Sequence, residues 1–187
     1  MKKLARNMLV VLSVLLLSAS LAQASSYVIG KLGTYFPEDS AYESGFGLRG
    51  AYGMSFRDLG FGRDPRPGSL LDKLLVEVGV GVYTADVDAA GQSGDIKVMP
   101  VTVSGVFVHR LPNLPVDLRA AVGLGTYFTE IDTTFEDDSS VEQGLYLNAG
   151  AIYHLNEQFG VLVDIDFDNA DADVGGWMLN AGIVYRP

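Results

Sequence analysis

The chain has 187 residues, with 13 Lys or Arg, 23 Asp or Glu and no cysteine. Its formal net charge of −10 argues against nucleic acid as a partner, because phosphate binding needs a basic surface. Without cysteine, the chain can form no disulfide, thiol nucleophile or thiolate metal site.

The N-terminal residues have the pattern of a secretion signal. Basic residues precede an apolar run from Met8 to Leu17, and Ala22-Gln23-Ala24 follows as an A-x-A cleavage site. The apolar run is too short to cross a bilayer as a helix, which takes roughly 20 residues. We therefore expect a signal peptide at 1–24 and one mature domain at 25–187.

After the signal, the chain divides into eight stretches of strand-like composition, separated by Asp, Gly, Pro, Asn and Ser. Apolar residues recur with a period of two rather than 3.6, which favours strands over helices. The stretch lengths bracket the roughly 9–11 residues that a tilted strand needs to cross a membrane. We expect strands at 27–36, 45–56, 74–84, 98–108, 116–128, 145–154, 160–167 and 176–185.

The alternation separates a large apolar face from a small or charged one, as Val76 and Val78 against Glu77 and Gly79 illustrate. A soluble ligand-binding barrel would turn the apolar face inward, whereas a membrane barrel turns it toward lipid. An Arg or Lys that faces lipid at the bilayer midplane lowers the stability of a barrel by about 2–4 kcal/mol. Charged residues interspersed with glycines fit a narrow interior, where side chains must pack together closely. We therefore predict a charged interior, as a structural plug or a pore lining, that contains Lys31, Arg49, Glu77, Asp117, Arg119, Asp164 and Asp166.

Two short motifs repeat along the chain. Gly33-Thr34-Tyr35-Phe36 recurs at 81–84 and 125–128, and Asn148-Ala149-Gly150 recurs as Asn180-Ala181-Gly182. The first motif lies on odd-numbered strands and the second on even ones, so the repeating unit is a hairpin. Four hairpins predict an all-β fold, an eight-stranded antiparallel up-and-down transmembrane β-barrel.

Aromatic and acidic residues sort by position along the strands. We expect one aromatic belt at Phe36, Phe46, Tyr83, Phe128, Tyr146, Phe167 and Trp177, and another at Tyr27, Tyr52, Phe56, Phe107, Tyr153, Phe159 and Tyr185. The connections 37–43, 85–95, 129–142 and 168–175 are acidic and contain no Lys or Arg, so we assign them as extracellular loops. Their most acidic positions are Glu136, Asp137, Asp138, Asp168, Asp171 and Asp173.

With these features the mature chain resembles the small outer-membrane barrels of the OmpA, OmpX and OmpW type from Gram-negative bacteria. The last strand is similar to their assembly signal at Asn180, Gly182 and Tyr185, although Pro187 stands where a final aromatic would be. The segment Val98-Met99-Pro100-Val101-Thr102 resembles the proline-containing fourth strand of OmpW-like proteins. A β-bulge would also explain a proline at this position. The resemblance implies export to the outer membrane through the Sec pathway. It also implies the barrel-assembly machinery, outer-membrane lipid and lipopolysaccharide as partners.

Three functions remain open from the sequence. The first is a structural or surface-interaction role with a lumen filled by polar side chains. The second is a narrow OmpW-like channel for small, including hydrophobic, solutes. The third is a soluble periplasmic carrier of the lipocalin type, which would need an apolar lumen.

We expect no enzyme activity, no cofactor and no metal site. The two histidines, His109 and His154, are both assigned to the periplasmic end, and neither pairs with a candidate nucleophile. The acidic run at 168–173 lacks the glycine and the later glutamate of a calcium-binding loop. The sequence identifies no extracellular partner.

Overall fold

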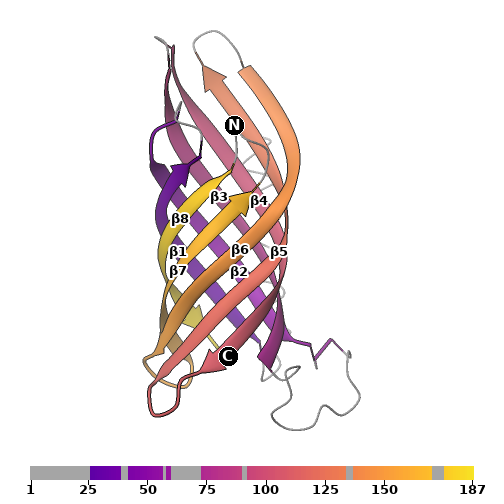
Figure 1. The fold of residues 1–187 in the computed structure, drawn as a ribbon, viewed down its shortest axis with the longest axis vertical. Coiled ribbons are helices and arrows are strands. Elements are labelled where there is room, and N and C mark those ends of the chain that lie inside the picture. The colour runs from indigo at the N-terminus through magenta and orange to yellow at the C-terminus, as the bar shows by residue number, and fades with distance from the viewer. Residues whose placement is uncertain are drawn as a thin grey trace.

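The strands form one closed antiparallel barrel, joined in chain order with the last strand paired to the first (Figure 1). A computed structural model of the protein describes residues 26–38, 42–56, 58–59, 73–89, 92–133, 137–169 and 175–187. None of these residues forms a helix long and apolar enough to cross a membrane. The strands are β1 Tyr27–Pro37, β2 Gly45–Ser55, β3 Leu74–Ala89, β4 Gln92–Arg110, β5 Val116–Thr133, β6 Asp137–His154, β7 Phe159–Asn169 and β8 Gly176–Tyr185. The predicted fold class is confirmed.

The pairing register sets the tilt of the strands. Directly opposed residues lead once around the barrel from Tyr27 through Gly53, Glu77, Ser104, Gly123, Tyr146, Asp168 and Gly176 to Pro37. The path returns to β1 ten residues beyond its start, so the eight strands have a shear of ten. Barrels of this size have strands tilted by about 35–45° and an interior that side chains can fill.

The two ends of the barrel differ. Strands β3 to β6 have 16 to 19 residues, whereas β1, β2, β7 and β8 have 10 or 11. The extra length lies where the β3–β4 and β5–β6 hairpins rise above the other strands (Figure 1). We call this the hairpin end. We call the opposite end, where β1 begins and β8 finishes, the terminal end.

The predicted loops 85–95 and 129–142 are largely strand, so those boundaries were wrong. Ala89 still pairs with Gln92, and Asp132 pairs with Asp137. Asp, Ser and Gly usually indicate turns, and the prediction followed that composition. The ladder continues past the apolar segment because cross-strand pairing, rather than residue preference alone, determines where a strand ends.

Pro100 interrupts hydrogen bonding in the wall without changing its register. Between β3 and β4, direct pairing stops after Val80 with Val101 and resumes at Tyr83 with Val98. The register is the same on both sides, so no residue is inserted and a β-bulge is not the explanation for the proline. Proline has no N–H to donate, which accounts for the gap in the ladder.

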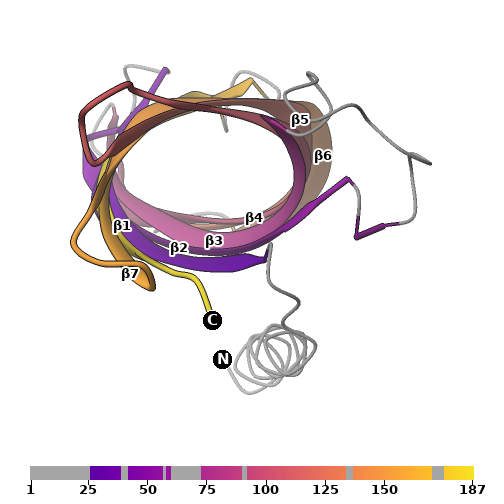
Figure 2. The same cartoon turned by 90° about the horizontal axis from the view of Figure 1, so that it is seen from below.

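The outer face of the barrel is apolar. Large side chains such as Val103, Val122 and Leu124 point outward from the wall and are 53%, 57% and 72% exposed. Viewed from the terminal end, the strands enclose an oval ring (Figure 2). A contiguous apolar surface of this kind marks contact with another apolar phase, which for a closed barrel is lipid.

Two aromatic pairs mark the limits of this apolar band on β7 and β8. Phe159 packs on Tyr185 with ring centroids 5.1 Å apart, and Phe167 packs on Trp177 at 4.5 Å. The pairs are eight residues apart along each strand, which spans roughly 20 Å at the expected rise and tilt. This distance is slightly less than the ~25 Å apolar band of outer-membrane barrels.

Four of the residues predicted for the belts are not exposed there. Tyr27, Tyr52, Tyr83 and Tyr146 are buried, each 8% exposed or less. The belt prediction used only their positions near strand ends. Tyr27, Tyr83 and Tyr146 share the inner face with charged residues, and their hydroxyls bond to those groups.

The lipid-facing band predicts a position-dependent effect of charge. Replacing Val78 by Arg on the outer face of β3 should lower the free energy of unfolding by about 2–4 kcal/mol, because the cation would face hydrocarbon. Urea unfolding of the protein refolded in lipid vesicles measures the change. Asp86→Arg is the control, since Asp86 is exposed on the same face of β3 beyond the band. Equal destabilisation by both variants would contradict this orientation of the wall.

Candidate functional site

Lys31 of β1 lies between two carboxylates of β7 in the middle of the barrel. Its Nζ is 2.8 Å from an oxygen of Asp164 and 2.7 Å from an oxygen of Asp166. All three side chains are 3% exposed or less. Buried charges are costly unless they are paired and hydrogen-bonded, so this arrangement needs further donors for the carboxylate oxygens.

Two asparagines provide those donors. Asn148 of β6 is opposite Asp166, and Asn180 of β8 is opposite Asp164, on the two strands that flank β7. The Asn148 amide donates to both carboxylates at 2.8 Å, and the Asn180 amide donates to both at 2.9 and 3.0 Å. These are equivalent residues of the repeated Asn-Ala-Gly motif. The repeat therefore supplies matched donors from both sides of β7.

The glycines of the same motif make room for the cluster. A Cβ on Gly150 would lie 2.4 Å from the Asp164 Cβ, and one on Gly182 would lie 2.6 Å from the Lys31 Cβ. Real Cβ atoms do not approach so closely, so any side chain at these positions would displace the charged residues. Residues two apart on a strand share a face, which is why asparagine and glycine of one motif both serve this cluster.

Arg49 of β2 extends the cluster toward the hairpin end. Its guanidinium donates to the Tyr83 hydroxyl at 2.8 Å and lies 4.1 Å from the centre of the Tyr146 ring, a cation–π contact. Its NH1 is 3.7 and 3.8 Å from oxygens of Asp166 and Asp168. One arginine thus links its own strand, β2, to the neighbouring β3 and to β6 and β7 across the lumen.

Asp168 belongs to this interior, and its assignment to an extracellular acidic loop was wrong. It is 1% exposed and accepts hydrogen bonds from the hydroxyls of Tyr83 and Tyr127. β7 continues to Asn169, so Asp168 follows Asp164 and Asp166 on the inner face. Asp137 and Asp138 are part of β6, whereas Glu136, Asp171 and Asp173 lie outside the described residues.

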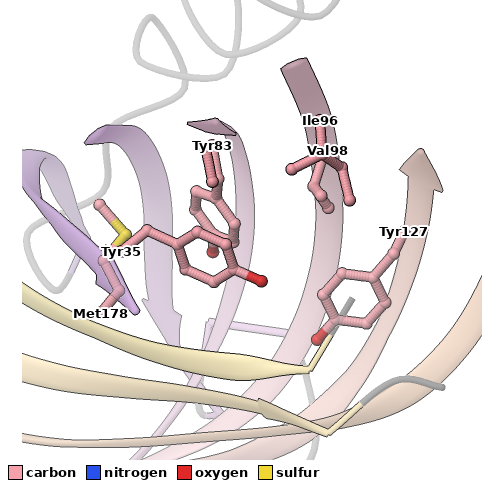
Figure 3. Packing of buried hydrophobic residues seen from close by; sticks show 7 residues of the cluster. Tyr35, Tyr83, Ile96, Val98, Tyr127 and Met178 are labelled. Atoms are coloured by element: carbon pink, nitrogen blue, oxygen red, sulfur yellow. The ribbon is translucent and has the colours of Figure 1, made fainter. Parts of the chain in front are cut away.

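A tyrosine-rich layer lies between the cluster and the hairpin end, and Figure 3 shows its side chains. The Tyr35 ring stacks on Tyr83 with centroids 5.1 Å apart. Tyr35, Tyr83 and Tyr127 occupy equivalent places in the repeated Gly-x-Tyr motif, so this repeat builds the layer. The layer, called the lid below, consists of Tyr35, Tyr83, Ala85, Ile96, Val98, Tyr127 and Met178.

Glu77 and Arg119 form a second group nearer the terminal end. Arg119 donates to both oxygens of Glu77, at 2.9 and 3.1 Å, and the Tyr27 hydroxyl donates to Glu77 at 2.8 Å. Both charged side chains are 5% exposed or less. The pair is a buried ion pair with its own hydrogen bonds, and it occupies the lumen below the central cluster.

Asp117 is separate from both groups. One of its oxygens is 3.1 Å from an Arg186 nitrogen and 2.8 Å from His154 Nε2 at the terminal end. The seven residues predicted for the interior are all buried, but they form three groups. These are the central cluster of Lys31, Arg49, Asp164 and Asp166, the Glu77–Arg119 pair, and Asp117.

The three residues of the predicted assembly signal each have a contact in the finished barrel. Asn180 binds the β7 carboxylates, Gly182 leaves space for Lys31, and the Tyr185 ring packs against Phe159. These contacts account for the residue types in the native structure. Their use as a signal during assembly stays a prediction.

Sequence reasoning missed the neutral members of this interior. Four of these side chains donate hydrogen bonds to the buried carboxylates: Asn148, Tyr83, Tyr127 and Tyr146. A signal for them was present, because the Gly-x-Tyr repeat places Tyr83 and Tyr127 on the inner face and the Asn-Ala-Gly repeat does so for Asn148. The repeats were used to count hairpins rather than to assign contacts.

A closed barrel with a lipid-facing apolar band and buried ionic groups defines an integral β-barrel membrane protein. The chain belongs to the outer membrane protein beta-barrel domain family, whose sequence profile matches residues 9–186. This family places it in the bacterial outer membrane. No curated protein matches the chain by sequence.

Solved structures with the same fold include those of three bacterial proteins. OprG from Pseudomonas aeruginosa has a TM-score of 0.63 at 17% identity, over 88% of this chain and 96% of that one. Neisserial surface protein A (NspA) has a TM-score of 0.61 at 15% identity, over 87% and 97% of the two chains. Ail of Yersinia pestis, in complex with the heparin analogue sucrose octasulfate, has a TM-score of 0.52 at 22% identity, over 86% and 97%. At these identities the likeness shows the fold alone.

Removing the central cation should unfold the barrel more readily. Lys31→Met leaves the Asp164 and Asp166 carboxylates without their closest positive charge, which should cost about 3–5 kcal/mol, as breaking a buried ion pair does. Urea unfolding of the protein refolded in detergent measures the loss. Lys97→Met is the control, because Lys97 lies on the outer face of β4 at the hairpin end. If the two variants unfold at the same urea concentration, the cluster does not stabilise the barrel.

Proposed function

We propose that this protein is a structural or surface-interaction protein of the outer membrane whose lumen is closed by its own side chains. The observation that carries the proposal is the central cluster. Lys31, Arg49, Asp164 and Asp166 are each 4% exposed or less and are bonded to one another or to neutral neighbours. The lid lies beyond them toward the hairpin end. An eight-stranded barrel has little room beyond such a filling.

Recording across planar lipid bilayers tests this proposal. The wild-type protein, refolded and shown to be heat-modifiable on gels, should give no stable open events, since a path for ions would have to break buried ion pairs. Reproducible openings of one size from wild-type protein would contradict a closed lumen and would favour the channel below.

The second candidate is a narrow channel with a lateral exit through the wall. One observation favours it, namely the gap in the β3–β4 ladder at Pro100, where opening would break fewer hydrogen bonds than elsewhere. Against it, Pro100 is buried, and its ring is 3.3 Å from where a Cβ of Gly81 would lie. Flux of a hydrophobic dye into liposomes, without ion conductance, is the result that a lateral exit predicts.

The charge of the hairpin end supports a cationic rather than a polyanionic partner. Glu38, Glu43, Asp86, Asp95 and Glu130 are all exposed there. Ail was crystallised with a sulfated heparin analogue, a polyanion that this acidic rim would repel. Divalent cations that bridge carboxylates to lipopolysaccharide phosphates suit the rim as well. We include no enzyme activity in the proposal.

The surface role requires residues 1–24 to act as a Sec signal and the hairpin end to face the medium. The cysteine-free chain allows a direct test with single cysteines and an impermeant maleimide. Asp86→Cys at the hairpin end should be labelled on intact cells, and Asn156→Cys in the β6–β7 turn only after permeabilisation. The intact mass of the labelled protein should correspond to a chain that starts at Ser25. The reverse labelling pattern would refute the orientation.

A further inference from the structure

A cavity opens at the terminal end of the barrel, below the Glu77–Arg119 pair. Its volume is about 370 Å³, and residues of β1, β3, β4, β5 and β6 contribute to its wall. Sites for small molecules commonly have volumes of about 300–1,000 Å³. Lys31, Arg49, Asp164 and Asp166 are not among its lining residues, so the cavity ends before the central cluster. We call it the vestibule.

The vestibule is positively charged. Lys73, Arg110, Arg119 and Arg186 line it, and Asp117 is the one carboxylate among its described lining residues. Asp117 is already engaged by Arg186 and by His154 from the neighbouring strand. Glu77, just above, offsets Arg119. Among the described residues two cations therefore remain in excess, and walls of low dielectric strengthen their field on a bound anion.

Arg110, at the mouth of the vestibule, has N–H donors that are available to a ligand. The Arg110 side chain is 61% exposed, and the nearest carboxylate oxygen among the described residues, on Asp117, is 3.6 Å from its Nε. That distance is beyond a good hydrogen bond, so all five of its N–H donors can meet a ligand. The Arg186 side chain is 32% exposed, and its guanidinium already contacts Asp117 and His154 through hydrogen bonds.

The other side of the vestibule is apolar. Leu75, Val108 and Ile152 line it together with the ring of Tyr27. Leu75 and Ile152 are inward-facing residues that pack within apolar clusters of the lumen. A bare inorganic anion would use only the cationic side. Both sides are used by a molecule with a charged end and a short apolar part.

We propose that the vestibule binds a small organic anion that carries an apolar group. Its carboxylate lies at Arg110 and Arg186, and its apolar part lies against Leu75, Val108 and Ile152. This site is independent of whether the lumen above it conducts, because the cavity ends below the central cluster.

Methyl-resolved NMR titration of the refolded full-length protein in zwitterionic micelles tests the proposal. Benzoate is the probe, inorganic phosphate supplies charge without an apolar part, and benzyl alcohol supplies the apolar part without charge. Benzoate should shift the methyl signals of Leu75, Val108 and Ile152 in a saturable manner. Phosphate and benzyl alcohol should bind more weakly by about tenfold or more, since each loses one set of contacts.

Charge variants locate the site. Arg110→Gln should raise the Kd for benzoate by about tenfold, the effect of losing a hydrogen bond to a charged group, and Arg110→Glu should abolish binding. Arg110 is largely exposed, so neither change should impair folding, which heat-modifiable gel mobility verifies. Lys97→Glu is the matched control at the opposite end and should leave the Kd unchanged.

Three results would overturn the proposal. Shifts that never saturate would indicate partition into the micelle alone. Equal affinity for phosphate and benzoate would indicate a bare anion site. An unchanged Kd in Arg110→Glu, or an equal loss in Lys97→Glu, would place the probe elsewhere.

Discussion

The structure depends on neutralising two carboxylates that β7 carries into the middle of the barrel. Asp164 and Asp166 are buried side by side on one strand, and burying two carboxylates is costly unless a cation and several hydrogen-bond donors accompany them. Lys31 reaches them from β1, across β8, and the asparagines reach them from the strands on either side. Because β1 and β8 are the first and last strands, this ion pair crosses the seam where the barrel closes. The cluster therefore forms fully only when the chain has closed on itself.

The same requirement explains the small residues around the cluster. Gly150 and Gly182 sit where any Cβ would collide with Asp164 or Lys31. Glycine weakens a strand, since it loses more backbone entropy on folding and packs no side chain. Here that cost is offset by the space it leaves for a buried ionic network. Charge and glycine on the inner face are thus two parts of one arrangement.

The outline of the fold could be predicted from the sequence, because alternation along a strand fixes which residues share a face. Strand number, topology and the buried positions of Lys31 and Arg49 all depend on this local period. Contacts between strands could not be predicted in the same way. They depend on the shear of ten, which sets how far each strand is displaced relative to its neighbours and is not encoded within any one segment.

Asp168 shows the limit of composition as a guide. It follows Asp164 and Asp166 at the same two-residue spacing, but the acidic residues after it indicated a loop. The two-residue period of the inner face was the stronger signal, because it places Asp168 inside the barrel. There it accepts hydrogen bonds from the hydroxyls of Tyr83 on β3 and Tyr127 on β5. The tyrosines were visible as a repeat. Only the closed barrel shows that repeated tyrosines and successive aspartates meet.

The central cluster and its asparagines, together called the plug here, lie between the hairpin end and the terminal end of the barrel. Its charged and amide groups, Lys31, Arg49, Asn148, Asp164, Asp166 and Asn180, come from β1, β2 and β6 to β8, whereas the wall extends furthest on β3 to β6. Residues beyond Asp86 on β3 and before Gly94 on β4 pair only within the projecting hairpin. Changes there leave the buried ion pairs untouched, and the plug in turn keeps the vestibule out of contact with the hairpin end. The surface role proposed for one end and the anion binding proposed for the other can therefore be altered independently, because the buried ionic groups lie between them.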